Sequence, residues 1–171
     1  MIKVMLFLLI VTAAGLIGTV LCNDLKKRRE EIENFLFGLR LIEGEITYAA
    51  PSLSLCFLRA GERLKGEMRV VFLHTAQLLE EQAIDGESAF HNALGRSREN
   101  LALTKRDLEW MGRFGVELGV TDLKNELKNF RYILRQGEEA LKDAERNEKK
   151  WCKVIGAGGW LFGFAAALTV L

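Results

Sequence analysis

Apolar residues recur at three- and four-residue steps along the middle of the chain, the spacing of one buried face of an α-helix. The clearest stretch runs from about Asp24 to Tyr48. Its apolar positions are Ile32, Phe35, Leu36, Leu39, Ile42 and Ile46. A half-buried strand would alternate apolar and polar residues, and no segment sustains that pattern. The middle of the chain is therefore predicted to be all-α.

Turn-forming and capping residues divide the following stretch into further helices. Pro51 suits the first residue of a second helix, and Gly66 precedes a third. Asp85 and Thr104 have short polar side chains that accept hydrogen bonds at helix N-termini, so we expect them to cap a fourth and a fifth helix. Asp107 would lie in the first turn of the fifth helix, where a negative charge is favourable.

The last helix is predicted to begin near Thr121 and Asp122 and to continue without a break to the end of the chain. Its apolar stripe stops at Leu141, but residues 142–153 are good helix formers of both charges and contain no glycine or proline. The sequence therefore predicts a bundle of about six antiparallel helices over residues 23–141. A charged helical stalk over 142–153 follows it.

Both ends of the chain lack charge over the length that spans a bilayer. Nineteen uncharged residues run from Val4 to Cys22, and eighteen run from Val154 to Leu171. About twenty apolar residues in a helix cross the hydrocarbon core. We expect residues 1–22 to form an N-terminal transmembrane anchor, and 154–171 to form a C-terminal transmembrane helix continuous with the last helix of the bundle. A cleaved signal peptide and a buried core helix are the respective alternatives.

Basic residues beside the two apolar segments predict the side of the membrane on which the middle lies. They are Lys26, Lys27, Arg28 and Arg29 after the first segment, and Lys149, Lys150 and Lys153 before the second. Positive charges near membrane spans stay on the cytoplasmic side. The middle is therefore expected in the cytoplasm, and both termini across the membrane.

Small residues recur four positions apart in both apolar segments. In lipid, close backbone approach over small side chains holds helices together. The positions are Ala14 and Gly18 in the first segment, and Gly159, Gly163 and Ala167 in the second. They indicate either helix pairing, within one chain or between copies, or simply the high frequency of glycine in membrane helices.

Charge and cysteine usage narrow the function classes. All charges except Lys3 fall between Asp24 and Lys153, and this middle carries 23 basic and 23 acidic side chains. That balance argues against a nucleic-acid-binding protein, which would show a basic excess. The three cysteines, at positions 22, 56 and 152, show no CxxC spacing. We therefore expect neither a disulfide framework nor a zinc site, and a reduced, cytosol-facing middle.

No catalytic signature stands out. His74 and His91 are isolated, and neither GxxxxGK[ST] nor GxSxG occurs. The chain is accordingly predicted to be no enzyme, with no cofactor, metal or catalytic residue. Glu43 and Glu45 point in different directions on a helix, so we expect one at the surface and the other paired with a basic residue across the bundle.

Gly112 and Gly115 lie inside a predicted helix, where each glycine costs about 1 kcal/mol relative to alanine. That cost indicates close helix packing, partner contact or a kink. Together with other polar or turn-associated positions, they are candidates for partner contact or helix packing. The full set of candidates is Glu43, Glu45, Tyr48, Gly112, Gly115 and Asp122.

The order and spacing of several short segments resemble the stage III sporulation protein AB family of endospore-forming bacteria, over the whole chain. An N-terminal anchor with basic residues precedes EGEITY at 43–48 and Pro51. LT at 103–104 leads to FGVELGVTD at 114–122, and NEK at 147–149 precedes the terminal apolar segment. Ala50 and Glu126 depart from the family pattern, which has threonine and glutamine there.

The resemblance implies a role rather than a reaction. The family is similar to the platform protein of type II secretion and type IV pilus machines, and it belongs to a channel complex between mother cell and forespore. It implies a secretion-type ATPase, other membrane channel components and membrane lipid as partners. The protein would lie in the outer forespore membrane, with its central domain in the mother-cell cytoplasm, docking or coupling the ATPase.

Two other functions are also compatible with the sequence. One is a self-assembling, membrane-tethered helical scaffold without ATPase coupling, for which homo-oligomers would form. The other is a membrane-bound helical sensor or enzyme, which would need a polar pocket with converging ionisable side chains.

Overall fold

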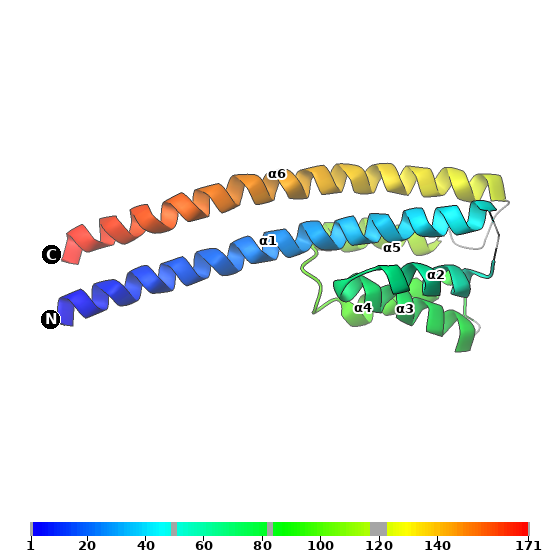
Figure 1. Ribbon diagram of the computed structural model, residues 1–171, viewed down its shortest axis with the longest axis horizontal. Coiled ribbons are helices and arrows are strands. Elements are labelled where there is room, and N and C mark those ends of the chain that lie inside the picture. Colours follow the sequence, from blue (N-terminus) through cyan, green and yellow to red (C-terminus); the bar gives the residue numbers. More distant parts are fainter. Residues whose placement is uncertain (1, 49–50, 82–83, 117–122, 171) are drawn as a thin grey trace. The chain divides into compact units, whose positions relative to one another are not determined.

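The computed structural model of the protein describes residues 2–48, 51–81, 84–116 and 123–170. Within these ranges, the helical backbone alone is described for 2–4, 6–8, 10–11, 14, 115–116, 123–129 and 156–170. The described residues form six α-helices and no strand, which confirms the predicted all-α class (Figure 1). The helices are α1 (Ile2–Tyr48), α2 (Leu53–Arg63), α3 (Gly66–Glu81), α4 (Gly86–Ser97), α5 (Lys105–Val116) and α6 (Leu123–Val170).

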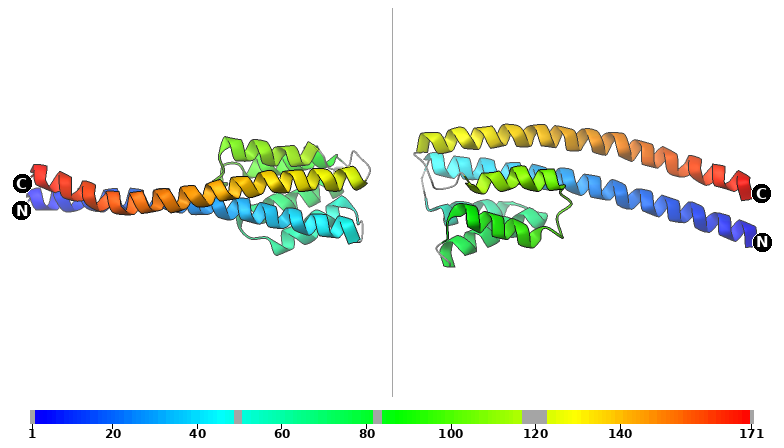
Figure 2. Two further views of the ribbon diagram at one scale, coloured as in Figure 1. Left: turned by 90° about the horizontal axis from the view of Figure 1, so that it is seen from above. Right: turned by 180° about the vertical axis from the view of Figure 1, so that it is seen from behind.

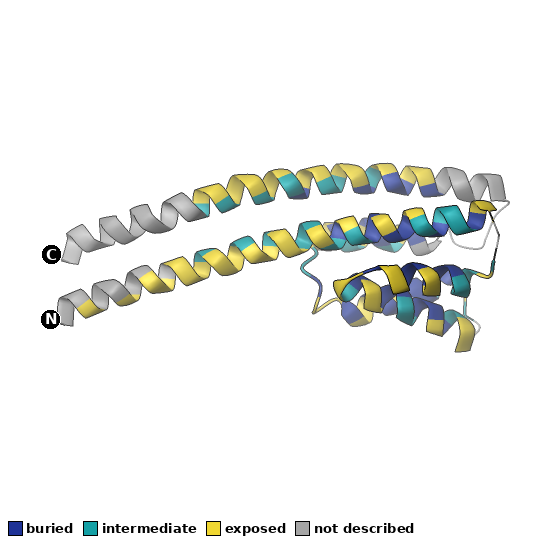
Figure 3. Cartoon of the chain, viewed as in Figure 1, coloured by how far each residue is buried: buried dark blue, intermediate teal, exposed yellow. Residues whose placement is uncertain are grey.

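The chain divides into two compact units, and both long helices take part in each. Residues Glu30–Lys142 form one unit, here called the central bundle. Met1–Arg29 and Asp143–Leu171 form the other, here called the terminal pair. Buried residues are concentrated in the central bundle, whereas most described residues of the terminal pair are exposed (Figure 3).

An aromatic cluster fills the core of the central bundle, and each of the six helices contributes one phenylalanine to it. The six are Phe35, Phe57, Phe72, Phe90, Phe114 and Phe130. The Phe35 ring lies 6.0 Å from Phe114 and 5.4 Å from Trp110 in edge-on geometry, centroid to centroid. Such pairs contribute about 0.5–1.5 kcal/mol beyond the burial of their area. The cluster therefore joins all six helices through one set of side chains.

Two glycines let α1 approach its neighbours closely within the central bundle. A Cβ added at Gly38 would lie 2.6 Å from the Phe72 ring of α3. A Cβ at Gly137 of α6 would overlap Leu36 of α1 and lie 3.1 Å from the Trp110 ring of α5. A side chain at either position would displace the core around it. In the bundle, α1 thus packs against both α3 and α6.

Helix starts follow local capping chemistry. The Asp85 side chain accepts a hydrogen bond from the Ser88 N–H at 2.8 Å at the start of α4. Thr104 and Asp107 bond reciprocally at the start of α5. Both predicted caps are confirmed. The prediction for Pro51 is wrong: α2 begins at Leu53 with Ser52 as its N-cap, because the Ser52 hydroxyl accepts the Leu55 N–H.

The long helices run further than the bundle. The predicted anchor and the first bundle helix are one continuous α1, and α6 continues as a single helix to Val170. Thr121 and Asp122, where the last helix was predicted to start, lie outside the described residues. Among the residues that the structure describes, no helix has a stretch long and apolar enough to cross a membrane.

Candidate functional site

The terminal pair brings together residues that are far apart in the sequence. Here α1 and α6 run side by side in opposite directions, as the views from further sides also show (Figure 2). Gly18 contacts Ile155, Cys22 bonds Cys152, and Arg29 pairs with Glu148. Numbers rise along α1 as they fall along α6, so the three contacts fix one antiparallel register.

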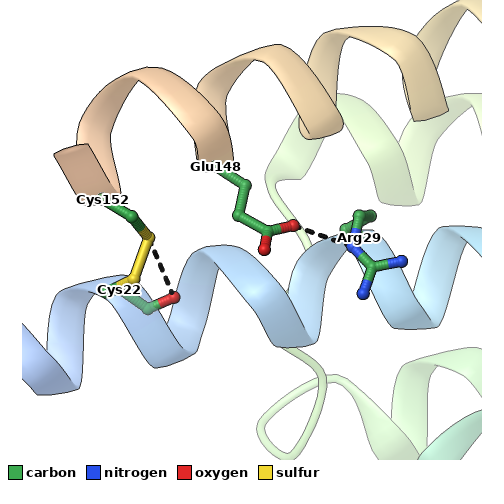
Figure 4. A network of polar contacts seen from close by, with 4 residues as sticks. All are labelled: Cys22, Arg29, Glu148 and Cys152. Carbon is green, nitrogen blue, oxygen red and sulfur yellow. Dashed lines mark hydrogen bonds and ion pairs between the residues drawn. A yellow bond between two sulfur atoms is a disulfide. The ribbon is translucent and has the colours of Figure 1, made fainter.

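A disulfide joins the two helices between Cys22 and Cys152 (Figure 4). The cysteines are 130 residues apart, and their Cα atoms lie 5.3 Å apart, within the range that a disulfide spans. The Cys152 sulfur also lies 3.8 Å from the Cys22 carbonyl oxygen. A disulfide sulfur carries no proton, so this approach is a contact rather than a hydrogen bond.

The expectation of no disulfide is therefore wrong. It rested on spacing along the chain, which detects local motifs such as CxxC but not pairs brought together by antiparallel helices. Cys22 ends the first uncharged run, and Cys152 lies between Lys150 and Lys153 at the start of the second. The available signal was that both cysteines lie where a charged helical segment meets an uncharged one, so an antiparallel pair of these helices would bring them together. Cys56 is buried in the central bundle and belongs to no disulfide.

An ion pair lies two turns along α1 from the disulfide. The Arg29 Nε donates to the Glu148 Oε2 at 2.8 Å, and the two side chains are only 28% and 20% exposed. Partial burial reduces solvent screening, so such a pair contributes more than the usual exposed surface pair. The segment 142–153, predicted as a solvated stalk, thus packs along α1 here, with Ala144 also buried.

The predicted topology-determining residues lie near the Cys22–Cys152 disulfide and the Arg29–Glu148 ion pair, together called the clamp. Lys26 and Lys27 are exposed on α1, and Arg28 is half-buried. Lys149, Lys150 and Lys153 are exposed on α6, on either side of Cys152. Because Cys22 and Cys152 are bonded, basic residues from both ends of the chain share one region of the terminal pair.

Close approach also occurs at one of the predicted small-residue positions. A Cβ on Gly18 would lie 2.7 Å from the Ile155 Cγ2 atom, so glycine permits this contact between the helices. Ala14, Gly159, Gly163 and Ala167 belong to α1 and α6, but their side-chain surroundings lie outside the described detail. Packing in lipid at these positions stays a prediction.

The candidates in the central bundle do not converge. The Glu45 carboxylate pairs with Arg59 of α2 at 2.7 Å, and the Glu43 carboxylate pairs with Arg131 of α6 at 3.6 Å. Both glutamates are therefore paired, where one of them was expected at the surface. Tyr48 is 91% exposed at the end of α1.

The remaining candidates in the bundle are Gly112, Gly115 and Asp122. A Cβ at Gly112 would meet only the His91 Nδ1, at 3.7 Å. The surroundings of Gly115 lie beyond the described detail, and Asp122 lies outside the described residues. Across the described part of the chain, no group of three or more His, Cys, Asp or Glu side chains could hold a metal ion.

These features define a class: an all-α protein with an aromatic-cored helical bundle and a cross-linked pair of terminal helices. The chain belongs to the stage III sporulation protein AB family, whose model matches residues 3–171. A curated relative, Stage III sporulation protein AB of Bacillus subtilis (strain 168), is 24% identical over 171 residues, covering 100% of both chains.

A solved structure of a Stage III sporulation protein AB has the same fold. It matches with a TM-score of 0.69 at 22% identity, over 72% of this chain and 98% of that one. At this identity the match is evidence for the fold alone.

Proposed function

We propose that the protein is a non-catalytic membrane platform of a secretion-like channel complex in endospore formation. In this role it docks or couples a secretion-type ATPase to the membrane apparatus. Residues 1–22 and 154–171 span the outer forespore membrane, together with other channel components, and the central bundle faces the mother-cell cytoplasm.

Membership of the stage III sporulation protein AB family over residues 3–171 carries the link to spore formation. The platform role draws on the family's similarity to secretion and pilus platform proteins. The architecture is compatible with it, because α1 and α6 each belong to both units.

Exposed apolar side chains in the terminal pair support the membrane assignment. Those described at the α1 end are between 50% and 73% exposed, and they are Met5, Leu9, Leu16, Ile17, Val20 and Leu21. Large apolar side chains that are exposed along one helix segment indicate a membrane or protein contact. The basic residues around the Cys22–Cys152 disulfide lie next to this apolar stretch. Anionic lipid headgroups at the membrane surface would attract them.

The membrane assignment is tested by fractionation and protease access. The full-length protein is expected to stay with membranes after high-salt washing, because apolar contacts do not weaken with ionic strength. Protease admitted to the mother-cell cytoplasm by selective permeabilisation of the outer cell membrane is expected to cleave the central bundle. Release by salt, or a bundle that stays uncleaved under these conditions, would refute the topology.

ATPase docking is tested by binding. The full-length protein in detergent is expected to retain the purified secretion-type ATPase of the same complex in a pull-down. A chain that binds no ATPase but forms a defined homo-oligomer, by light scattering, would favour the self-assembling scaffold. A chain that does neither would refute both functions.

A further inference from the structure

A surface groove lies between α4 and α5 in the central bundle. Its volume is about 390 Å³. Seven residues line it: His91, Leu94, Gly95, Arg98, Lys105, Leu108 and Glu109. We propose that this α4–α5 groove binds an apolar, carboxylate-bearing segment of the secretion-type ATPase. The inference rests on the proposed function and names the docking surface within it.

Glycine keeps the groove open. A Cβ at Gly95 would have no atom within 4 Å, and one at Gly112, a turn along α5 from Leu108, would meet only His91. Gly38 and Gly137 differ, because packing inside the bundle requires them. Each helical glycine costs about 1 kcal/mol relative to alanine. No internal contact requires glycine at position 95, and the absence of a side chain there leaves room in the groove for a partner side chain.

The charge of the groove selects an acidic partner. Arg98 and Lys105 are both exposed, and neither has an ion-pair partner among the described residues. Lys105 lies in the first turn of α5, where the helix dipole disfavours a positive charge. Residues 30–142 as a whole carry 15 basic and 19 acidic side chains. The groove thus offers free cations in an otherwise acidic unit, which favours and orients a carboxylate.

The size and lining of the groove favour a protein segment over a small anion. Its volume is at the lower end of the range of about 300–1,000 Å³ for ligand pockets. That volume suits a few side chains of a docked helix or strand. Leu94 and Leu108 contribute apolar lining, and the two cations Arg98 and Lys105 outnumber the single carboxylate of Glu109. An apolar side chain flanked by a carboxylate satisfies both parts of the surface.

The test measures the affinity of the full-length protein in detergent for the purified ATPase. One variant reverses the charge, with Arg98→Glu and Lys105→Glu combined, and another fills the groove with Gly95→Met. Both substitutions lie on the surface, and methionine raises helix propensity, so folding is expected to persist. We expect each variant to bind about tenfold more weakly or worse, and wild-type binding to weaken as salt rises.

Matched controls separate this site from general effects. Arg106→Glu reverses an exposed charge on the same helix outside the groove lining, and Gly44→Met fills another open glycine. Both are expected to bind as wild type. Equal binding by wild type and the groove variants would overturn the groove and leave the platform function standing. Equal loss in the controls would also overturn the groove. No binding by wild type would overturn both proposals.

Discussion

Phe35 lies at the centre of the aromatic core. It is fully buried, and its ring contacts those of Phe72, Phe90 and Phe114 from three other helices. Truncation of a buried phenylalanine removes transfer free energy and leaves a cavity. We expect Phe35→Ala to lower the free energy of unfolding by about 3–5 kcal/mol, measured by chemical denaturation of the full-length protein in detergent.

The matched control for this core substitution is Phe37→Ala, two residues along the same helix. Phe37 is 44% exposed, so little packing is lost there. Its substitution is expected to change stability by about 0.5 kcal/mol or less, as at most surface sites. Equal destabilisation by the two substitutions would contradict a core centred on Phe35.

The sequence predicted the core face of α1 at the level of single residues. Phe35 belongs to the apolar stripe predicted between Asp24 and Tyr48, and its burial follows from that periodicity. It did not predict that Gly137 would contact Leu36 and Trp110. A glycine carries no hydrophobic signal, and close approach depends on which helices become neighbours.

At the scale of the element, the reciprocal cap of α5 is the clearest local determinant of a helix start. The Thr104 hydroxyl accepts the Asp107 N–H at 3.2 Å, and the Asp107 carboxylate accepts the Thr104 N–H at 2.9 Å. Thr104→Ala is expected to destabilise the bundle by about 1 kcal/mol, because an N–H at the helix start loses its acceptor. The measurement is the midpoint of chemical denaturation, followed by far-UV circular dichroism.

Thr47→Ala provides the control for this cap. Thr47 is exposed within α1 and donates its hydroxyl to the Glu43 carbonyl at 2.7 Å. That bond goes to a carbonyl inside the helix and does not stabilise the helix, and alanine has the higher helix propensity. Stability is expected to stay equal or to rise slightly. An equal loss at both positions would mean that threonine removal itself, rather than the cap, destabilises the protein.

The Asp85 cap of α4 makes the stability of the folded protein depend on pH. Hydrogen bonds from the Ser88 N–H and hydroxyl lower the pKa of the Asp85 carboxyl below its ordinary value. A lowered pKa in the folded state means that the carboxylate stabilises the fold at neutral pH. This stabilisation is lost as the pH falls from the unfolded pKa through the folded one.

Asp85→Asn tests this dependence, because asparagine keeps an oxygen acceptor but does not titrate. The stability advantage of wild type over Asp85→Asn is expected to be constant near neutral pH and to shrink as acid protonates Asp85. Denaturation of both proteins across the acidic range measures it. An advantage that does not change with pH would contradict a stabilising carboxylate at this cap.

Helix starts were predictable because capping is local. Asp85 and Thr104 act on residues three positions away, so short sequence patterns reveal them. Pro51 was misplaced because proline suits several positions near a helix start, and Ser52, with a hydroxyl acceptor, took the cap. The continuity of α1 from the apolar end into the bundle also escaped prediction. The sequence pattern placed the start of the first bundle helix near Asp24, although the residues on both sides of Asp24 are acceptable helix formers.

At the scale of the whole molecule, the decisive contacts are long-range. The clamp residues of α1 lie more than 100 positions from their partners on α6, so no local pattern encodes the pairing. It follows from two helices that share an antiparallel register. The candidates in the bundle failed to converge for a related reason. Their ion pairs join α1 to two different helices, and exposed ion pairs of this kind contribute little to the stability of the fold.

The Cys22–Cys152 bond makes the last prediction, because it closes most of the chain into one covalent loop. When free thiols are alkylated before the cells are lysed, the cross-link is expected to stay intact. The unreduced protein should then migrate faster on a gel than the reduced protein. Both cysteines are half-buried, which limits the access of cytoplasmic reductants. Cys152→Ser is expected to abolish the shift, and Cys56→Ser to retain it.

For a loop of over a hundred residues, chain entropy predicts a loss of stability approaching about 5 kcal/mol on reduction. Alkylation of both Cys22 and Cys152 in unreduced wild type would contradict the clamp.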